Sequence, residues 1–115
     1  MPLTFELAEF TVADEDEPAL LAGRQAMAKG LRRAFPGALA AWLTQQDDGS
    51  WLDIVLWRSR EEAEDAAAWI EEVPEARAWF RHIAKSRGLR HVEVVEQTLF
   101  DLAPRAIDSG DSPGL

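Results

Sequence analysis

Four short segments of the chain alternate between apolar and polar residues, which is the pattern of β-strands. They span residues 3–12, 38–45, 51–57 and 90–100. Each segment carries apolar side chains at both odd and even positions, so each predicted strand has two apolar faces. In the first segment the apolar positions change phase between Leu7 and Ala8, and this change predicts a β-bulge in that strand.

Three further segments have the residue spacing of amphipathic helices. They span residues 18–34, 59–73 and 74–87. An acidic run before Pro18 suits the start of the first helix, because carboxylates favour the positive end of the helix dipole. Ser59 and Glu62 have the spacing of a capping box, in which the glutamate reaches back to the backbone N–H of the serine. We expect Gly49 in a hairpin turn between the second and third strands, and Gly88 just beyond the third helix.

The order of these elements is strand, helix, strand, strand, helix, strand, with the second helical stretch broken at Pro74. It predicts an α+β fold of the ferredoxin-like type, in which a four-stranded antiparallel sheet carries helices on one face. Because the strands are apolar on both faces, the other face needs cover, and an identical subunit packed across a two-fold axis provides it. We therefore expect a homodimer built from one domain, residues 1–102, with residues 103–115 as a C-terminal tail or arm.

Composition and charge narrow the classes of function. The chain has 115 residues and a formal net charge of -9, which would repel nucleic acids and anionic membrane surfaces. It has no cysteine, which excludes disulfides, thiolate nucleophiles and iron–sulfur clusters, and its two histidines have no spacing typical of a metal site. The N-terminus lacks the pattern of a signal peptide and no apolar run is long enough for a membrane span, so we expect a cytoplasmic protein without bound metal.

Several short motifs resemble the antibiotic biosynthesis monooxygenase-like group of dimeric α+β barrel proteins, over roughly residues 3–100. The matching stretches are Pro36-Gly37, Asp48-Gly49-Ser50-Trp51-Leu52-Asp53, Trp57-Arg58-Ser59 and the alanine-rich helix that begins at Glu61-Glu62-Ala63-Glu64. The resemblance implies a homodimer whose two sheets close into a barrel, with a pocket between each sheet and its helices. Some members oxidise polycyclic phenolic compounds with O2 and neither metal nor flavin, others degrade haem, and many have no known activity.

The chain departs from this family at positions that carry chemistry. It contains no asparagine and no tyrosine, although several members use an asparagine in the first strand and some use a tyrosine. Trp57 matches the family's aromatic position at the end of the third strand, whereas the place of the histidine that ligates haem is occupied by alanines at positions 66–68. The resemblance therefore disfavours haem binding, for which His82 would be the remaining ligand, and we expect no cofactor.

An oxygenase without a cofactor needs a base, a water-poor cavity and hydrogen-bond donors for reduced oxygen. Asp53 has apolar neighbours in its strand, so it is either paired with an arginine or kept neutral by its surroundings. Arg24 interrupts the apolar stripe of the first helix. We expect its side chain to pair with Asp53, to pair with a ligand anion, or to extend into solvent. His82 follows Trp79 by one helical turn, so it either acts as a base or is an ordinary surface histidine. His91 is a weaker candidate for the base.

Five tryptophans are the most unusual feature of the composition. Those near predicted contacts between sheet and helices either stack on a flat aromatic ligand or pack in the core. We predict His82, Asp53 and Trp57 as catalytic residues, and Trp42, Trp69, Trp79 and Arg24 as substrate-binding residues. The predicted function is cofactor-independent oxidation of a small aromatic compound. The alternative is a dimer that binds a small molecule, or has a structural role, without catalysis.

Overall fold

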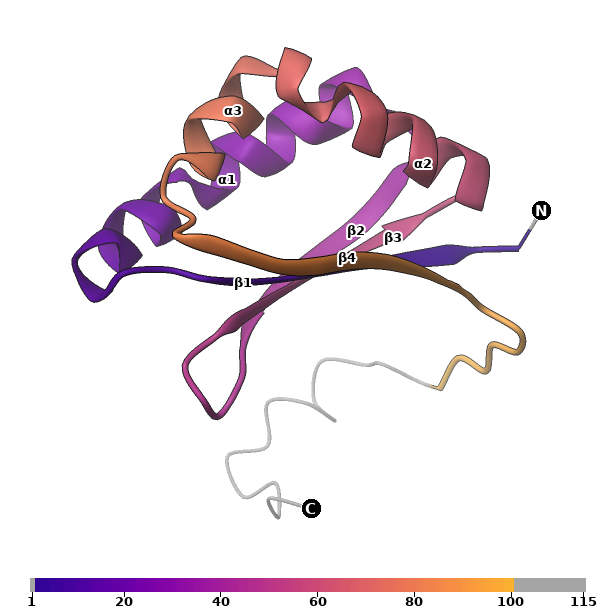
Figure 1. The fold of residues 1–115 in the computed structure, drawn as a ribbon. Helices are drawn as coiled ribbons and strands as arrows, with labels where there is room; N and C mark the ends of the chain where they lie inside the picture. The colour runs from indigo at the N-terminus through magenta and orange to yellow at the C-terminus, as the bar shows by residue number, and fades with distance from the viewer. Residues whose placement is uncertain (1, 101–115) are drawn as a thin grey trace.

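A computed structural model describes residues 2–100 of the protein and shows an antiparallel sheet of four strands with helices on one face (Figure 1). The elements are β1 (Thr4–Thr11), η1 (Asp14–Asp16), α1 (Glu17–Ala34), β2 (Ala38–Gln45), β3 (Trp51–Trp57), α2 (Arg60–Trp69), η2 (Ile70–Glu72), α3 (Pro74–Phe80) and β4 (Lys85–Glu93). The strand order is β2-β3-β1-β4. The predicted ferredoxin-like α+β fold is confirmed, and the predicted arm at residues 103–115 lies outside the described residues.

The bulge predicted in the first strand lies in the last strand instead. Along β1 the pairing with β4 is regular as far as Glu9, which faces Gly88, but Phe10 faces Ser86, so that Arg87 is the extra residue. The phase change in β1 has another cause, namely that its two faces are both apolar. Ala8 and Phe10 point towards the helices, and Phe5 and Leu7 point to the other side of the sheet.

The boundary between the third helix and the last strand was also predicted wrongly. Helix α3 ends at Phe80, and β4 begins at Lys85, where a regular helix was expected to continue. Gly88 has a φ of 131°, a conformation that glycine adopts readily, and it serves the bulge rather than the end of a helix. The pairing with β1 ends near the N-terminus, where the backbone N–H of Val94 donates to the carbonyl of Leu3 at 2.8 Å.

The hairpin turn at Gly49 and the helix cap at Ser59 form as the sequence predicts. Gly49 has a φ of 91° in the hairpin between β2 and β3, where a side chain would be strained. The Ser59 hydroxyl caps α2 by accepting from the backbone N–H of Glu62 at 3.2 Å. The Glu62 carboxylate does not follow the predicted pattern, because it accepts from the Ser59 hydroxyl at 3.0 Å and from Arg58.

The helices pack on the sheet through a buried apolar layer. The stripe of α1 includes Leu20, Met27 and Leu31, as its spacing predicts. Ala63 and Ala66 of α2 are buried, and their small side chains allow the helix to lie close to β3. No helix in residues 2–100 is long and apolar enough to cross a membrane.

The face of the sheet opposite the helices is apolar. No helix of residues 2–100 covers it (Figure 1). The strand register places half-buried Phe5, Leu7 and Ile54 on it, together with Trp42 and Val92, which are 49% and 37% exposed. The rings of Phe5 and Trp42 lie 6.5 Å apart across this face. Both faces of the sheet are therefore apolar, as the sequence predicts, and only one is covered by helices of the described residues.

Candidate active site

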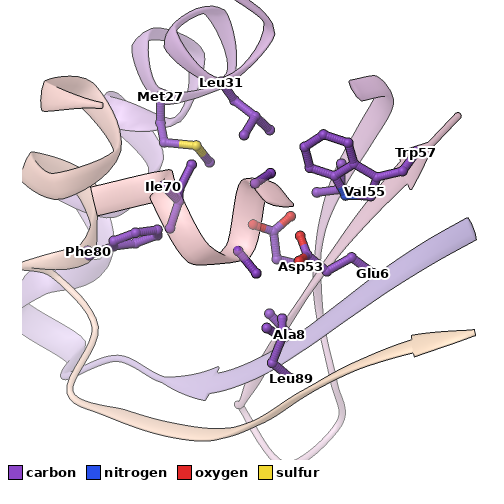
Figure 2. Close-up of a pocket in the computed structure, with 12 residues that line it drawn as sticks. Glu6, Ala8, Met27, Leu31, Asp53, Val55, Trp57, Ile70, Phe80 and Leu89 are labelled. Carbon is purple, nitrogen blue, oxygen red and sulfur yellow. The ribbon is translucent and has the colours of Figure 1, made fainter. Parts of the chain in front are cut away.

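A pocket of about 170 Å³ lies between the sheet and the helices (Figure 2). Its walls are mostly apolar and include Met27 and Leu31 of α1, Ile70 of η2 and Phe80 of α3. Figure 2 shows the carboxylates of Glu6 and Asp53 close together on the sheet side of the pocket. A cavity of roughly 150 Å³ holds one benzene molecule, so this pocket has the size of a single substituted ring.

Asp53 is held by an ion pair with Arg24, one of the arrangements that the sequence allows. Arg24 donates from its two terminal nitrogens to the two carboxylate oxygens, at 2.7 and 2.8 Å. Both side chains are mostly buried, with 14% of Arg24 and 11% of Asp53 exposed. The guanidinium also lies 5.1 Å from the centre of the Trp79 ring, a cation–π contact. The pair thus fixes the Asp53 carboxylate at the floor of the pocket.

A second pair, Glu6 and His91, lies beside the first on the same face of the sheet. Glu6 is in the central strand β1, and its partner in the edge strand β4 is His91. The distance from His91 Nε2 to Glu6 Oε2 is 3.1 Å, and 11% and 16% of the two side chains are exposed. Burial raises the pKa of Glu6, and the hydrogen bond and charge of His91 lower it in part. A carboxyl group with a raised pKa is a stronger base than an ordinary one.

Trp57 contributes a hydrogen-bond donor that has no partner. Its side chain is 1% exposed, and its ring packs edge-on against Phe35 at 6.3 Å. The buried indole nitrogen makes no hydrogen bond within the described residues, although it lies near enough to Glu6 to be one of the causes that lower the pKa of that group. A buried N–H without an acceptor is costly, so it is suited to bind an oxygen atom of a ligand.

The structure brings some of the predicted residues together and separates others. Asp53 and Trp57 line the pocket, and Arg24 binds Asp53. Trp79 lies in the core, where its indole donates to the carbonyl of Leu20 at 2.8 Å. The remaining predicted residues do not line the pocket: they are Trp42 on the open face of the sheet, Trp69 at 58% exposure and His82 after the end of α3.

Sequence reasoning missed Glu6 and gave His91 little weight. The signal for Glu6 was that it alternates with Ala8 and Phe10 along β1. Its side chain therefore lies on the same face of the strand, the one that the helices cover. Its partner is 85 residues away, and the strand that holds His91 was predicted to begin only at residue 90. Their meeting depends on the register of β1 and β4, which no local pattern predicts.

The pocket has no arrangement of side chains that is typical of a metal site. Among residues 2–100, no group of three or more histidine and carboxylate side chains could hold a metal ion. Ala66 and Ala67 line the pocket as small apolar side chains. The polar groups at the pocket are the two pairs and the indole of Trp57.

No protein-family model and no curated protein matches this sequence. Solved structures do match in fold. SnoaB of Streptomyces nogalater, a cofactor-independent oxygenase, is 21% identical with a TM-score of 0.63 over 88% of this chain and 100% of that one. A Caulobacter crescentus protein assigned to the antibiotic biosynthesis monooxygenases is 15% identical with a TM-score of 0.64, over 83% and 92% of the two chains.

A third solved structure of similar fold is MupZ of Pseudomonas fluorescens, which is 11% identical with a TM-score of 0.64 over 79% of this chain and 71% of that one. The resemblance to antibiotic biosynthesis monooxygenases that the motifs predict is thereby confirmed in the fold. At these identities the likeness concerns the arrangement of the chain, and chemistry has to be argued from the pocket itself.

Proposed function

We propose that the protein is a monooxygenase-like enzyme that oxidises a small aromatic compound with O2 and without a cofactor. One observation carries the proposal, namely that an apolar pocket encloses a buried, unpartnered indole N–H together with two carboxylates. Apolar walls exclude water and strengthen the electrostatic effect of these few polar groups. The likeness in fold to a cofactor-independent oxygenase supports the same reading.

The reaction needs a substrate that supplies all the electrons. A phenolic or enolisable compound loses a proton to a base, and the electron pair that remains makes the anion able to reduce O2. A CH2 group and O2 then give a carbonyl group and water, with four electrons taken from the substrate and no external reductant. The Trp57 N–H is placed to donate to the oxygen of the substrate anion or to reduced oxygen, because it has no other acceptor among the described residues.

The pocket limits the size of the substrate. Its volume of about 170 Å³ fits one substituted ring, whereas ligand pockets for larger molecules usually have about 300 Å³ or more. Within this proposal Phe80, Ile70 and Met27 contact the ring, and Asp53 accepts from a hydroxyl group while Arg24 holds it in place. A compound with several fused rings requires the helices to move away from the sheet.

Oxygen consumption tests the proposal. Purified protein, treated with a chelator and free of flavin absorbance, is mixed with a series of one-ring and two-ring hydroxyaromatic compounds at an oxygen electrode. Trp57→Phe keeps the ring and removes the N–H, so we expect turnover to fall by about 10²-fold while the fold is retained. Trp51→Phe is the matched control, because Trp51 lies on the same face of β3 with an unpartnered buried N–H but does not line the pocket.

The outcomes separate enzyme from binding protein. Oxygen uptake that Trp57→Phe reduces and Trp51→Phe does not supports an oxygenase. Binding of aromatic compounds without any oxygen uptake contradicts it and supports the non-catalytic alternative. His82 was predicted to be catalytic from the sequence, and His82→Asn tests that role in the same assay, since its side chain does not line the pocket.

We also propose that a second copy of the chain covers the open face of the sheet. The face presents Trp42, Val92 and Ile54 to solvent in the single chain, and burial of such apolar surface yields about 25 cal/mol per Å². Native mass spectrometry of the purified protein reads the number of subunits and any retained small molecule together. We expect a dimer that Trp42→Glu converts to a monomer, and a wild-type monomer would contradict the proposal.

A further inference from the structure

Glu6 and His91 form a buried acid–base pair that connects the pocket to the edge of the sheet. Glu6 lines the pocket from the central strand, and His91 lies opposite it in β4, the last strand of the sheet. Their side chains are in hydrogen-bond contact at 3.1 Å. Folding a carboxylate into an apolar pocket is unfavourable, so a pair in this position calls for a functional explanation.

We propose that Glu6 is the general base of the pocket and that His91 relays the proton from Glu6 to solvent. The inference rests on the proposed function, because it supplies the proton transfer that must precede the reaction with O2. Glu6 contacts the substrate and is the catalytic residue of the two, whereas His91 acts only through Glu6.

The hydrogen bonds of the two carboxylates favour Glu6 over Asp53 as the base. Both oxygens of Asp53 accept from Arg24, so one lone pair on each oxygen is engaged by a permanent cation. In Glu6 only Oε2 has a hydrogen-bond partner within residues 2–100, namely His91, and the Trp57 indole N–H lies near the carboxylate without a hydrogen bond to it. A proton from a bound compound can therefore be taken at Oε1 without breaking the contact with His91.

The charged groups around Glu6 come from three elements. His91 faces it from β4, Asp53 from β3, and Arg24 of α1 binds Asp53. The α2 side contributes only the alanines at positions 66 and 67. Desolvation and the charge of Asp53 raise the pKa of Glu6, while His91 lowers it, so removal of His91 would raise it further.

Every proton and electron pair in this transfer is accounted for. The O–H or C–H bond of the substrate breaks, its electron pair stays on the substrate, and the proton binds Glu6. Glu6 then passes a proton to Nε2 of the His91 imidazole, Nδ1 releases its proton to solvent, and exchange of the ring protons with solvent restores the starting tautomer. Without His91 the proton on Glu6 tends to return to the substrate, because the apolar walls keep water away from the carboxylate.

Anaerobic deuterium exchange tests this transfer separately from oxidation. The probe is phenylacetone, a one-ring enolisable ketone, in D2O under argon, with the full-length protein and mass spectrometry of the recovered ketone. Glu6→Gln is expected to slow the exchange by about 10²-fold or more, and Glu6→Asp to restore part of the rate. Glu9→Gln is the matched control, because Glu9 lies in the same strand, contacts Arg87 and does not line the pocket.

The contact of His91 with Glu6 has its own signature in the pH profile. His91→Asn is expected to lower the rate and to move the acidic limb of the profile to higher pH, because Glu6 then ionises only at higher pH. A purely structural role would lower the rate without moving this limb. Thermal melting of every variant establishes that the fold is retained.

Three results would overturn the assignment. The first is exchange in Glu6→Gln at the wild-type rate, and the second is a wild-type rate no faster than that of buffer. The third is loss of exchange in His82→Asn while His91→Asn keeps the wild-type rate, which would make the histidine after α3 the proton acceptor. Exchange that follows the expected pattern together with no oxygen uptake by any substrate supports the base and refutes the oxygenase.

Discussion

The ion pair between Arg24 and Asp53 should make a large contribution to the stability of the fold. Arg24→Ala leaves the Asp53 carboxylate, only 11% exposed, without a cation. Removal of one partner from a buried pair costs about 3–5 kcal/mol, and the cation–π contact with Trp79 adds about 0.5–1 kcal/mol. Because 14% of the Arg24 side chain is exposed, we take the lower end of the sum, about 3.5 kcal/mol.

A matched control exists on the same helix. Arg33 of α1 also binds a carboxylate through two hydrogen bonds, to Glu75 at 2.8 Å each, but 60% of its side chain is exposed. Arg33→Ala therefore makes the same change of residue type in the same helix and should alter the stability only slightly, because solvent screens the pair. The comparison isolates the effect of burial from that of hydrogen-bond geometry.

The assay is thermal unfolding followed by circular dichroism at one protein concentration, since dimerisation would make the Tm depend on concentration. About 3.5 kcal/mol corresponds to a fall in Tm of about 14 °C or more for a domain of this size.

A double variant separates the unpaired charge from lost packing. Arg24→Met with Asp53→Leu removes both charges and keeps apolar volume, so it should be more stable than Arg24→Ala alone. A Tm for Arg24→Ala no lower than that for Arg33→Ala would refute the reasoning. A double variant as unstable as the single one would do the same.

Three smaller effects follow from other contacts. Glu6→Gln should raise the Tm at neutral pH and have little effect in acid, as melts at several pH values would show. The reason is that the folded pKa of Glu6 is raised, so the contribution of Glu6 to stability is present below the ordinary carboxyl pKa and is lost as the pH rises through the folded value. Gly49→Ala should cost about 1 kcal/mol by urea unfolding, because its φ of 91° strains a side chain although the space around it is open. Ser59→Ala should cost about 1 kcal/mol in the same measurement through loss of the α2 cap, whereas Ser59→Asp should retain most of the stability.

The elements of the fold were largely readable along the chain. The strands β2 and β3 have their predicted bounds, because Gly49 marks the turn between two segments of clear alternation. Helix α1 was recognised from its apolar stripe and α2 from its cap at Ser59. One error fell at Gly88, where a glycine that serves a bulge was interpreted as the end of a helix. Both structures use glycine for the same conformational freedom, so the residue type alone does not distinguish them.

The candidate site was predictable only in part. Asp53 and Trp57 were found because a polar and a large aromatic side chain stand out within one apolar strand, and Arg24 because it interrupts an apolar stripe. His82 and Trp79 follow the same kind of local argument, yet α3 directs Trp79 into the core and ends before His82. The direction of a side chain at the end of a short helix depends on packing that the local pattern does not contain.

The sequence by itself determined the order of the elements, the two apolar faces of the sheet and the absence of thiol chemistry, since these follow from periodicity and composition. The tertiary structure alone decided which polar groups share the pocket. Glu6 and His91 meet because β1 pairs antiparallel with β4, the strand farthest from it along the chain, in a particular register. A shift of that register by one residue would turn His91 to the opposite face of the sheet, so the site exists only in the folded chain.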